Sequence, residues 1–241
     1  RPRPAVIALP GHDGPIERGA YWATGPYEWP GVEPYMHSYG RRLAEAGYVV
    51  LAIDVAGIGE LGYLGYERLV NEGLLIGEPL KRIMLEQVHE AVDYLLARPE
   101  VDPRQVGVAG VSLGGELAMF AGLLDPRLAF VVSSGFLTSY RETGGTEMAS
   151  LYIPGVLEVA DIPDLAAMVA PKPMLIQAAR NDSHFRIEDA RRHVAKVRQA
   201  YGGAGAAGAL SYQEHDRGHT LDVPAMLAWL ARVAPVPGHA D

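Results

Sequence analysis

The sequence predicts an α/β fold, a doubly wound and mostly parallel sheet of about six or more strands with helices on both faces. Short apolar runs alternate with segments of helical period about six times along the chain. The apolar runs are continuous, which is typical of parallel strands that are covered on both faces. The 241 residues suffice for one large core, so we expect a single domain over residues 1–241.

The predicted elements follow one another in regular order. The expected strands are residues 5–9, 48–54, 106–111, 128–132, 174–178 and 209–213. The expected helices are residues 34–46, 81–97, 113–124, 187–201 and 223–234. Pro10-Gly11 stops the first strand, a Gly-rich loop follows the second, and Pro103 is expected to break the chain before the third. Gly202 is expected to close the fourth helix, and Asp222 with Pro224 opens the fifth.

Two segments carry no clean period and are expected near the site. Residues 12–34 form an unusually aromatic loop, and residues 135–162 read as a lid-like excursion over a pocket. Their aromatic side chains supply candidate substrate-binding residues, namely Tyr21, Trp22, Trp29 and Tyr152. These rings could stack against a sugar, or they could serve only structural packing.

The bulk composition excludes several classes of function. Lys and Arg number 21 against 29 Asp and Glu, a net charge of −8, so nucleic acid and anionic membranes are not expected partners. The absence of cysteine excludes disulfides, Cys-ligated metals and a Cys nucleophile. The apolar stretch 106–124 contains Glu116 and reads as a buried strand and helix, not as a membrane span. With no signal peptide visible at Arg1 we expect a cytoplasmic protein, a secreted protein without its leader being the alternative.

The strongest local motif is the G-x-S-x-G of residues 110–114. It stands between the third predicted strand and the helix that follows, where a serine at the tip of a tight turn is held in a strained conformation. The glycines are needed because a side chain two positions to either side would collide with the opposite arm. The alternative is a Gly-rich turn in which Ser112 is only a helix N-cap.

A serine hydroxyl needs an imidazole to take its proton and a carboxylate to orient that imidazole. We favour His219, which follows the last predicted strand on a Gly-preceded loop, over His215, whose ring should pack beside the sheet. His89 and His193 are expected on charged helix faces, and His37 and His239 in solvent. Asp182 follows the 174–178 strand and is preferred to Asp54 as the acid.

Two other motifs suggest different chemistry. Residues 57–62 spell G-x-G-x-x-G after a strand, but Gly62, Gly65 and Gly73 interrupt the helix that phosphate binding would need. Glu86 and His89 form a single carboxylate–His pair, short of a metal site. We therefore expect no cofactor and no metal.

The order Ser112, Asp182, His219 resembles that of the α/β-hydrolase superfamily. The stretches 9–14, 54–59, 110–115, 162–165, 170–173 and 218–219 are similar to the branch of acetyl xylan esterases and dienelactone-hydrolase-like esterases. The oxyanion donors are expected to be the N–H of Leu113, which follows the nucleophile, and by the resemblance that of His12, although Pro10 replaces the family's usual His.

The resemblance implies a serine hydrolase that cleaves small carboxylic esters through an acyl-enzyme, with deacetylation of carbohydrate esters as the first expectation. A serine peptidase or broad carboxylesterase is the alternative, and a catalytically inactive binding protein on the same fold is a more remote one. The expected partner is a small-molecule ester, and the oligomeric state stays open.

Overall fold

The computed structural model describes residues 1–12, 37–143 and 152–238. Its centre is a six-stranded sheet in the order β2-β1-β3-β4-β5-β6, in which every neighbouring pair is parallel. The strands are β1 (Arg3–Leu9), β2 (Val49–Ala52), β3 (Val101–Val111), β4 (Phe130–Ser134), β5 (Met174–Ala179) and β6 (Leu210–His215). The predicted doubly wound parallel sheet is thus confirmed.

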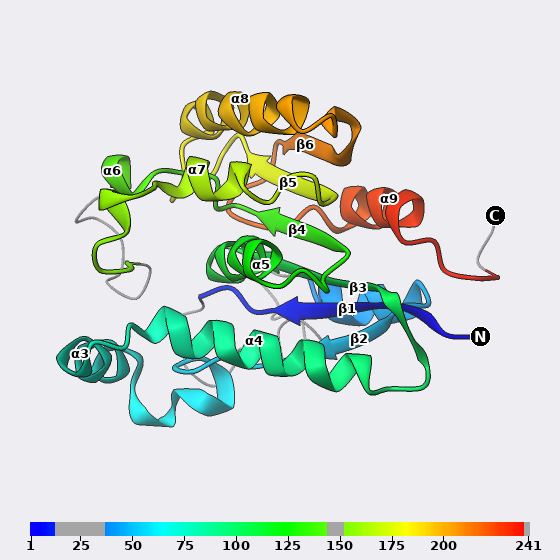
Figure 1. The fold of residues 1–241 in the computed structure, drawn as a ribbon, viewed down its shortest axis with the longest axis horizontal. Coiled ribbons are helices and arrows are strands. Elements are labelled where there is room, and N and C mark those ends of the chain that lie inside the picture. The colour runs from blue at the N-terminus through cyan, green and yellow to red at the C-terminus, as the bar shows by residue number, and fades with distance from the viewer. Residues whose placement is uncertain (13–36, 144–151, 239–241) are drawn as a thin grey trace.

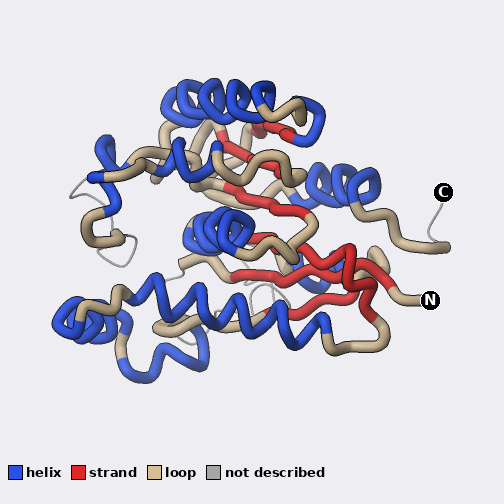
Figure 2. Tube along the Cα trace, viewed as in Figure 1, coloured by secondary structure: helices blue, strands red, loops and turns tan. Residues whose placement is uncertain are grey.

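Helices cover both faces of this sheet, as Figure 2 shows. One apolar core lies under α4 (Leu80–Leu96), α5 (Leu113–Leu124), α7 (Ile162–Ala167) and α8 (Ile187–Gly203). The second core lies under α2 (Tyr39–Glu45) and α9 (Val223–Val233). Alternate side chains of β1 divide between them, Ile7 in the first core and Val6 in the second, because successive residues of a strand point to opposite faces.

The carboxyl ends of the strands meet at one edge of the sheet, at the left in Figure 1. The short helices α3 (Tyr66–Ile76) and α6 (Tyr140–Thr143) lie beyond this edge. Ligands of open α/β sheets bind outside the carboxyl ends of the strands. None of the described helices is long and apolar enough to cross a membrane.

The sequence suggested that Pro103 breaks the chain before the third strand. In the structure Pro103 lies within β3. The register between β1 and β3 shifts there, from Arg3 opposite Val101 to Ala5 opposite Val106. The irregularity accommodates a residue that has no N–H to donate, so the strand continues on both sides of it.

Helical segments also form where loops were expected. The glycine-rich stretch after β2 contains the 3-10 helix η1 (Gly59–Leu64) and then α3, and the C-terminal part of the excursion contains the 3-10 helix η3 (Val156–Glu158) and leads into α7. Asp161 caps α7 in a capping box with Asp164. A further 3-10 turn, η4 (Ala207–Ala209), precedes β6, and α8 runs past Gly202 to Gly203 before it ends.

Candidate active site

Ser112 stands between β3 and α5, as the motif predicted, with a backbone φ of 55° and ψ of −121°. A positive φ is uncommon for a residue with a side chain and marks stored strain. The surrounding contacts impose it, because the Ser112 N–H donates to Ser134 O at 2.8 Å and the Glu116 N–H donates to Ser112 O at 2.9 Å. The turn is therefore fixed by β4 on one side and by the first turn of α5 on the other.

The glycines of the motif are required because side chains at these positions would collide with the opposite arm of the turn, as predicted. A Cβ on Gly110 would lie 2.3 Å from the backbone of Gly114, and a Cβ on Gly114 would lie 2.6 Å from Leu9 O. Gly115 is equally confined, since its Cβ would lie 2.6 Å from Ser134 O. The arms of the turn pack backbone to backbone, which leaves no room for side chains.

His219 and Asp182 meet directly although 37 residues separate them, with His219 Nδ1 lying 2.8 Å from Asp182 Oδ2. The side chains are 12% and 2% exposed, so the pair is largely shielded from water. Because the carboxylate accepts from Nδ1–H, the opposite nitrogen, Nε2, is left as the one able to accept a proton.

The other oxygen of Asp182 is also occupied. Its Oδ1 accepts from the backbone N–H of His184 at 2.8 Å and of Phe185 at 3.0 Å. Burial acts to raise the pKa of Asp182, but the hydrogen bond and charge of His219 and these two N–H groups outweigh it, so the pKa lies below its usual value. Asp182 is thus held as a carboxylate.

The His219 ring is enclosed by neighbours from two loops. The rings of His184 and Phe185 lie 4.7 and 5.6 Å from it, centroid to centroid. A Cβ on Gly135 would lie 3.3 Å from His219 Cε1. Gly135 directly follows Ser134, the residue that accepts the N–H of Ser112, so Ser112 and His219 both lie against the carboxyl end of β4.

The competing histidines have other surroundings. His215 ends β6 with its ring buried, as predicted, and burial lowers its pKa. His89 Nδ1 lies 2.9 Å from Asp125, and His193 Nε2 lies 2.8 Å from Glu142. His37 is half-buried, not fully solvated as expected, because it begins the turn that leads into α2. His239 lies outside the described residues.

Of the two predicted oxyanion residues, Leu113 directly follows Ser112 and His12 lies on the loop after β1. Leu113 is the first residue of α5, so its N–H is one of the N-terminal groups that have no partner within the helix. The loop after β1 runs against the same turn, since Leu9 O and Pro10 O limit the space at Gly114. His12, two residues further on, packs its ring edge-on to Tyr66 at 4.7 Å.

The candidate substrate-binding residues divide between two regions. Tyr21, Trp22 and Trp29 lie outside the described residues. Tyr152 is half-buried and meets the ring of Tyr140 edge-on at 5.9 Å.

The structure also shows the surroundings of the alternative acid and of the other two motifs. Asp54 faces the loop after β2, because a Cβ on Gly59 would lie 2.2 Å from its carboxylate. The G-x-G-x-x-G glycines lead into the 3-10 helix η1, not into an α-helix as phosphate binding would need. In the described ranges, three or more His, Asp or Glu side chains nowhere gather closely enough to hold a metal ion.

The arrangement of sheet, strained serine turn and Asp–His pair defines the α/β-hydrolase fold. A structure described as an acetyl xylan esterase from Bacteroides fragilis superposes with a TM-score of 0.72 at 19% identity, covering 99% of this chain and 67% of that one. A CE15 glucuronoyl esterase from Caldicellulosiruptor kristjansonii gives 0.66 at 19% identity, covering 95% and 68%. At this level of sequence identity, the similarity to these two structures shows a shared fold.

Within that fold, the chain belongs to the dienelactone hydrolase family, which it matches over residues 27–206. It is an ester hydrolase with serine at the nucleophile position. It is 25% identical over 223 residues to a Bacillus subtilis protein named as a hydrolase, YtaP, covering 90% of this chain and 73% of that protein. It is 33% identical over 144 residues to human acyl-coenzyme A thioesterase 1, covering 59% of this chain but only 32% of that protein.

Several residues near the site were not singled out from the sequence. Gly135, His184 and Phe185 act on His219 or Asp182 only because distant loops meet at the edge of the sheet. Glu116 offered a signal, since it places a charge among apolar neighbours, whereas Lys81 stands beside Arg82 and offered none; both prove buried.

Proposed function

We propose that the protein is a serine esterase in which Ser112 attacks the carbonyl carbon of a small ester. His219 Nε2 takes the hydroxyl proton and returns it to the leaving alcohol, while Asp182 orients the ring. The N–H groups of Leu113 and His12 hold the oxyanion of the tetrahedral intermediate. Water then attacks the acyl-enzyme: His219 takes a proton from the water and returns it to Ser112 Oγ as the bond to the acyl group breaks and the acid leaves.

The observation that carries this proposal is the hydrogen bond between His219 and Asp182 at the end of β4 where Ser112 is held in its strained turn. A buried carboxylate on Nδ1 leaves the far nitrogen of the imidazole as the base. That is the arrangement that makes a serine hydroxyl nucleophilic.

The first test is replacement of the nucleophile. Ser112→Ala should lower kcat for p-nitrophenyl acetate by at least about 10⁴-fold and abolish labelling by a fluorophosphonate probe. Ser183→Ala, an exposed serine directly after Asp182, is the matched control and should keep both activity and labelling. Labelling that survives Ser112→Ala would remove Ser112 from the mechanism.

For the substrate we propose acetyl esters of carbohydrates, in line with the acetyl xylan esterase among the structural neighbours. Similarity to the acyl-coenzyme A thioesterases supports a second candidate, an acyl thioester. A p-nitrophenyl series from acetate to decanoate, run beside acetylated xylan, an acyl-coenzyme A and an aminoacyl amide, separates these. A preference for long acyl chains, the thioester or the amide would contradict the deacetylase assignment.

A further inference from the structure

Three polar side chains from three helices meet in the apolar interior beside the candidate site. Lys81 of α4 pairs with Glu116 Oε2 of α5, and Tyr140 of α6 donates its hydroxyl to Glu116 Oε1 at 2.8 Å. They are 1%, 0% and 4% exposed. The mechanism above uses none of them.

A charged pair in the interior is costly to desolvate, and it persists only where its geometry satisfies both partners. Burial lowers the pKa of Lys81 and raises those of Glu116 and Tyr140. Tyr140 consequently stays protonated and remains a hydrogen-bond donor. Removal of its hydroxyl would leave one oxygen of Glu116 without that donor in a region closed to water.

Glu116 lies one helical turn from the nucleophile, since its N–H donates to Ser112 O at 2.9 Å. Tyr140 opens the segment that leaves the carboxyl edge of the sheet after β4. The two ends of that segment are joined, because Asp161 accepts from Ser139 Oγ at 2.6 Å and from the Tyr140 N–H at 2.8 Å. Glu116 therefore connects the serine turn with the base of the excursion.

The excursion also forms a hollow. A cavity of about 510 Å³ is lined by Tyr140, Tyr152, Ile153, Val156, Leu157 and Glu158, and we refer to these six residues as the side wall. Apart from Glu158 and the tyrosine hydroxyls, these side chains are apolar. Two hydrogen bonds hold Tyr140 from within, that of its hydroxyl to Glu116 and that of its N–H to Asp161.

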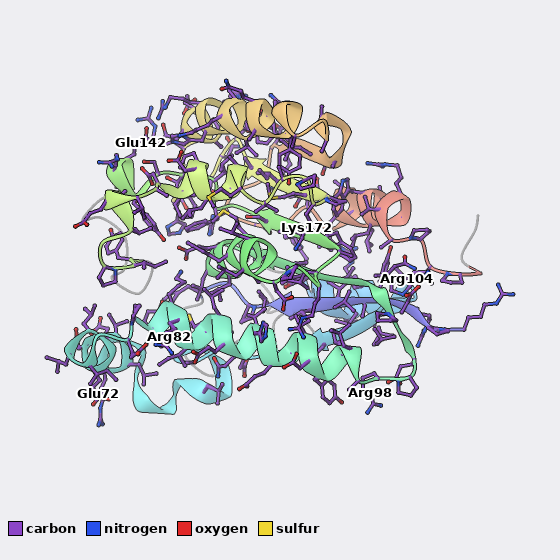
Figure 3. The ribbon with its side chains drawn as sticks, in the orientation of Figure 1. Glu72, Arg82, Arg98, Arg104, Glu142 and Lys172 are labelled. Carbon is purple, nitrogen blue, oxygen red and sulfur yellow. The ribbon has the colours of Figure 1, made fainter. Side chains whose placement is uncertain are left out.

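The outer surface of α6 is held differently. Glu142, labelled in Figure 3, contacts Arg192 at 2.6 Å and His193 at 2.8 Å, both on α8. Arg192 is half-exposed, and ion pairs in contact with water contribute little. The inward contact of Tyr140 should therefore matter more for the position of the side wall than the outward contacts of Glu142.

We propose that Lys81, Glu116 and Tyr140 form a positioning network that holds the side wall against the helix of Ser112, and that the wall binds the bulky apolar part of larger esters. This inference rests on the proposed function. Small esters such as ethyl acetate, which have no bulky apolar group for the wall to bind, depend on the network little. Esters with an aryl or branched alkyl group depend on it through KM, because chemistry at Ser112 is unchanged.

Tyr140→Phe tests the network with minimal change of volume. The KM for a bulky aryl ester should rise about tenfold, while kcat for that ester and both constants for ethyl acetate stay within about twofold. Tyr201→Phe is the matched control, because Tyr201 is equally buried and donates to Lys172 O at 2.7 Å, away from the excursion. Glu142→Gln, which weakens the outer anchor, should change KM less than Tyr140→Phe.

Hydrogen exchange supplies a readout that does not depend on turnover. Faster exchange over residues 152–160 in Tyr140→Phe, but not in Tyr201→Phe, is expected. Equal changes for small and bulky esters, or exchange unchanged from the wild type, would overturn the inference. Failure of the wild type and of Tyr201→Phe to hydrolyse any ester would instead overturn the proposed function, and the role of the wall in substrate binding with it.

Discussion

At the scale of single residues, the position of the His219 ring depends on a glycine that carries no chemistry. Gly135 has φ of 60°, and an added Cβ would lie 3.3 Å from His219 Cε1 and 3.4 Å from Nδ1. Gly135→Ala should lower kcat/KM for p-nitrophenyl acetate by about 10–100-fold, because small displacements of a base are costly to catalysis.

Backbone strain alone does not produce that loss, and a second glycine checks this. Gly205 has φ of 68° with nothing within 4 Å of its Cβ position, so Gly205→Ala introduces the same kind of strain far from the imidazole. The free energy of unfolding, measured in urea, should fall by about 1 kcal/mol in both variants. Only Gly135→Ala should lose activity. Equal kinetics for the two variants would exclude the contact with His219.

The residues that sequence reasoning identified are those whose chemistry is local or whose position along the chain is diagnostic. Ser112 was predictable as a candidate nucleophile from its flanking glycines, and Asp182 and His219 as its candidate partners from their places after strands. Gly135 and His184 were not, because their roles arise from contacts between loops that are distant in the sequence. His37 was misjudged because the burial of a turn depends on the packing around it.

At the scale of elements, the structure explains a glycine that sequence reasoning took as a helix breaker. Gly73 lies inside α3, where a Cβ would come within 2.4 Å of Glu78 O. The close approach lets α3 turn sharply into α4, so the helix forms in spite of the glycine. Its poor propensity is outweighed by the packing that the missing side chain allows.

A matched pair of helical glycines tests this explanation. Gly73→Ala should destabilise the protein by about 1–3 kcal/mol although alanine favours helices, because the clash is with backbone. Gly202→Ala in α8, where nothing lies within 4 Å, should stabilise it by about 0.5–1 kcal/mol. Urea unfolding of both variants supplies the measurement, and stabilisation by Gly73→Ala would contradict the account.

Element prediction succeeded where the apolar pattern was strong and failed where tertiary contacts decide. Helices α4 and α8 were predicted within a few residues because their apolar positions recur at helical spacing. Helix α7 was missed because its six residues are too few for a period, and its Asp161 capping box was not recognised. Pro103 misled because a register shift between neighbouring strands cannot be seen in one strand.

At the scale of the whole molecule, alternation of strands and helices was enough to predict the sheet. Parallel pairing of consecutive strands requires helical crossovers, and those were visible in the sequence. The order β2-β1-β3-β4-β5-β6 was not predicted, since it depends on which edge of the sheet each crossover returns to.

The outermost strand on one side of the sheet, β6, is held by ion pairs, which makes the stability of the protein depend on pH. Glu214 on β6 accepts from Arg191 of α8 at 2.7 and 2.8 Å and from Arg180, just after β5, at 3.1 Å. The hydrogen bond from Arg191, opposed by partial burial and aided by that from Arg180, lowers the pKa of Glu214 to about 2. One carboxylate thus ties the edge strand to its neighbouring strand and to its covering helix.

The sign of the pH effect follows from the direction of this shift. An unfolded Glu has a pKa of about 4.3, so the ionised form is favoured by folding, and its contribution is fully present above that pH. The contribution is lost as pH falls from about 4.3 towards 2. Because Arg191 is half-exposed, solvent screening keeps it near 1 kcal/mol.

Glu214→Gln should therefore lower the free energy of unfolding by about 1 kcal/mol at pH 7, and the difference from wild type should shrink at pH 4 and shrink further at pH 3. Urea unfolding at pH 7, 5, 4 and 3 measures it. Glu72→Gln removes an exposed pair with Arg68 on α3 and should change stability little at any of these pH values. If the loss of unfolding free energy in Glu214→Gln stayed constant down to pH 3, packing and not charge would hold β6 in place.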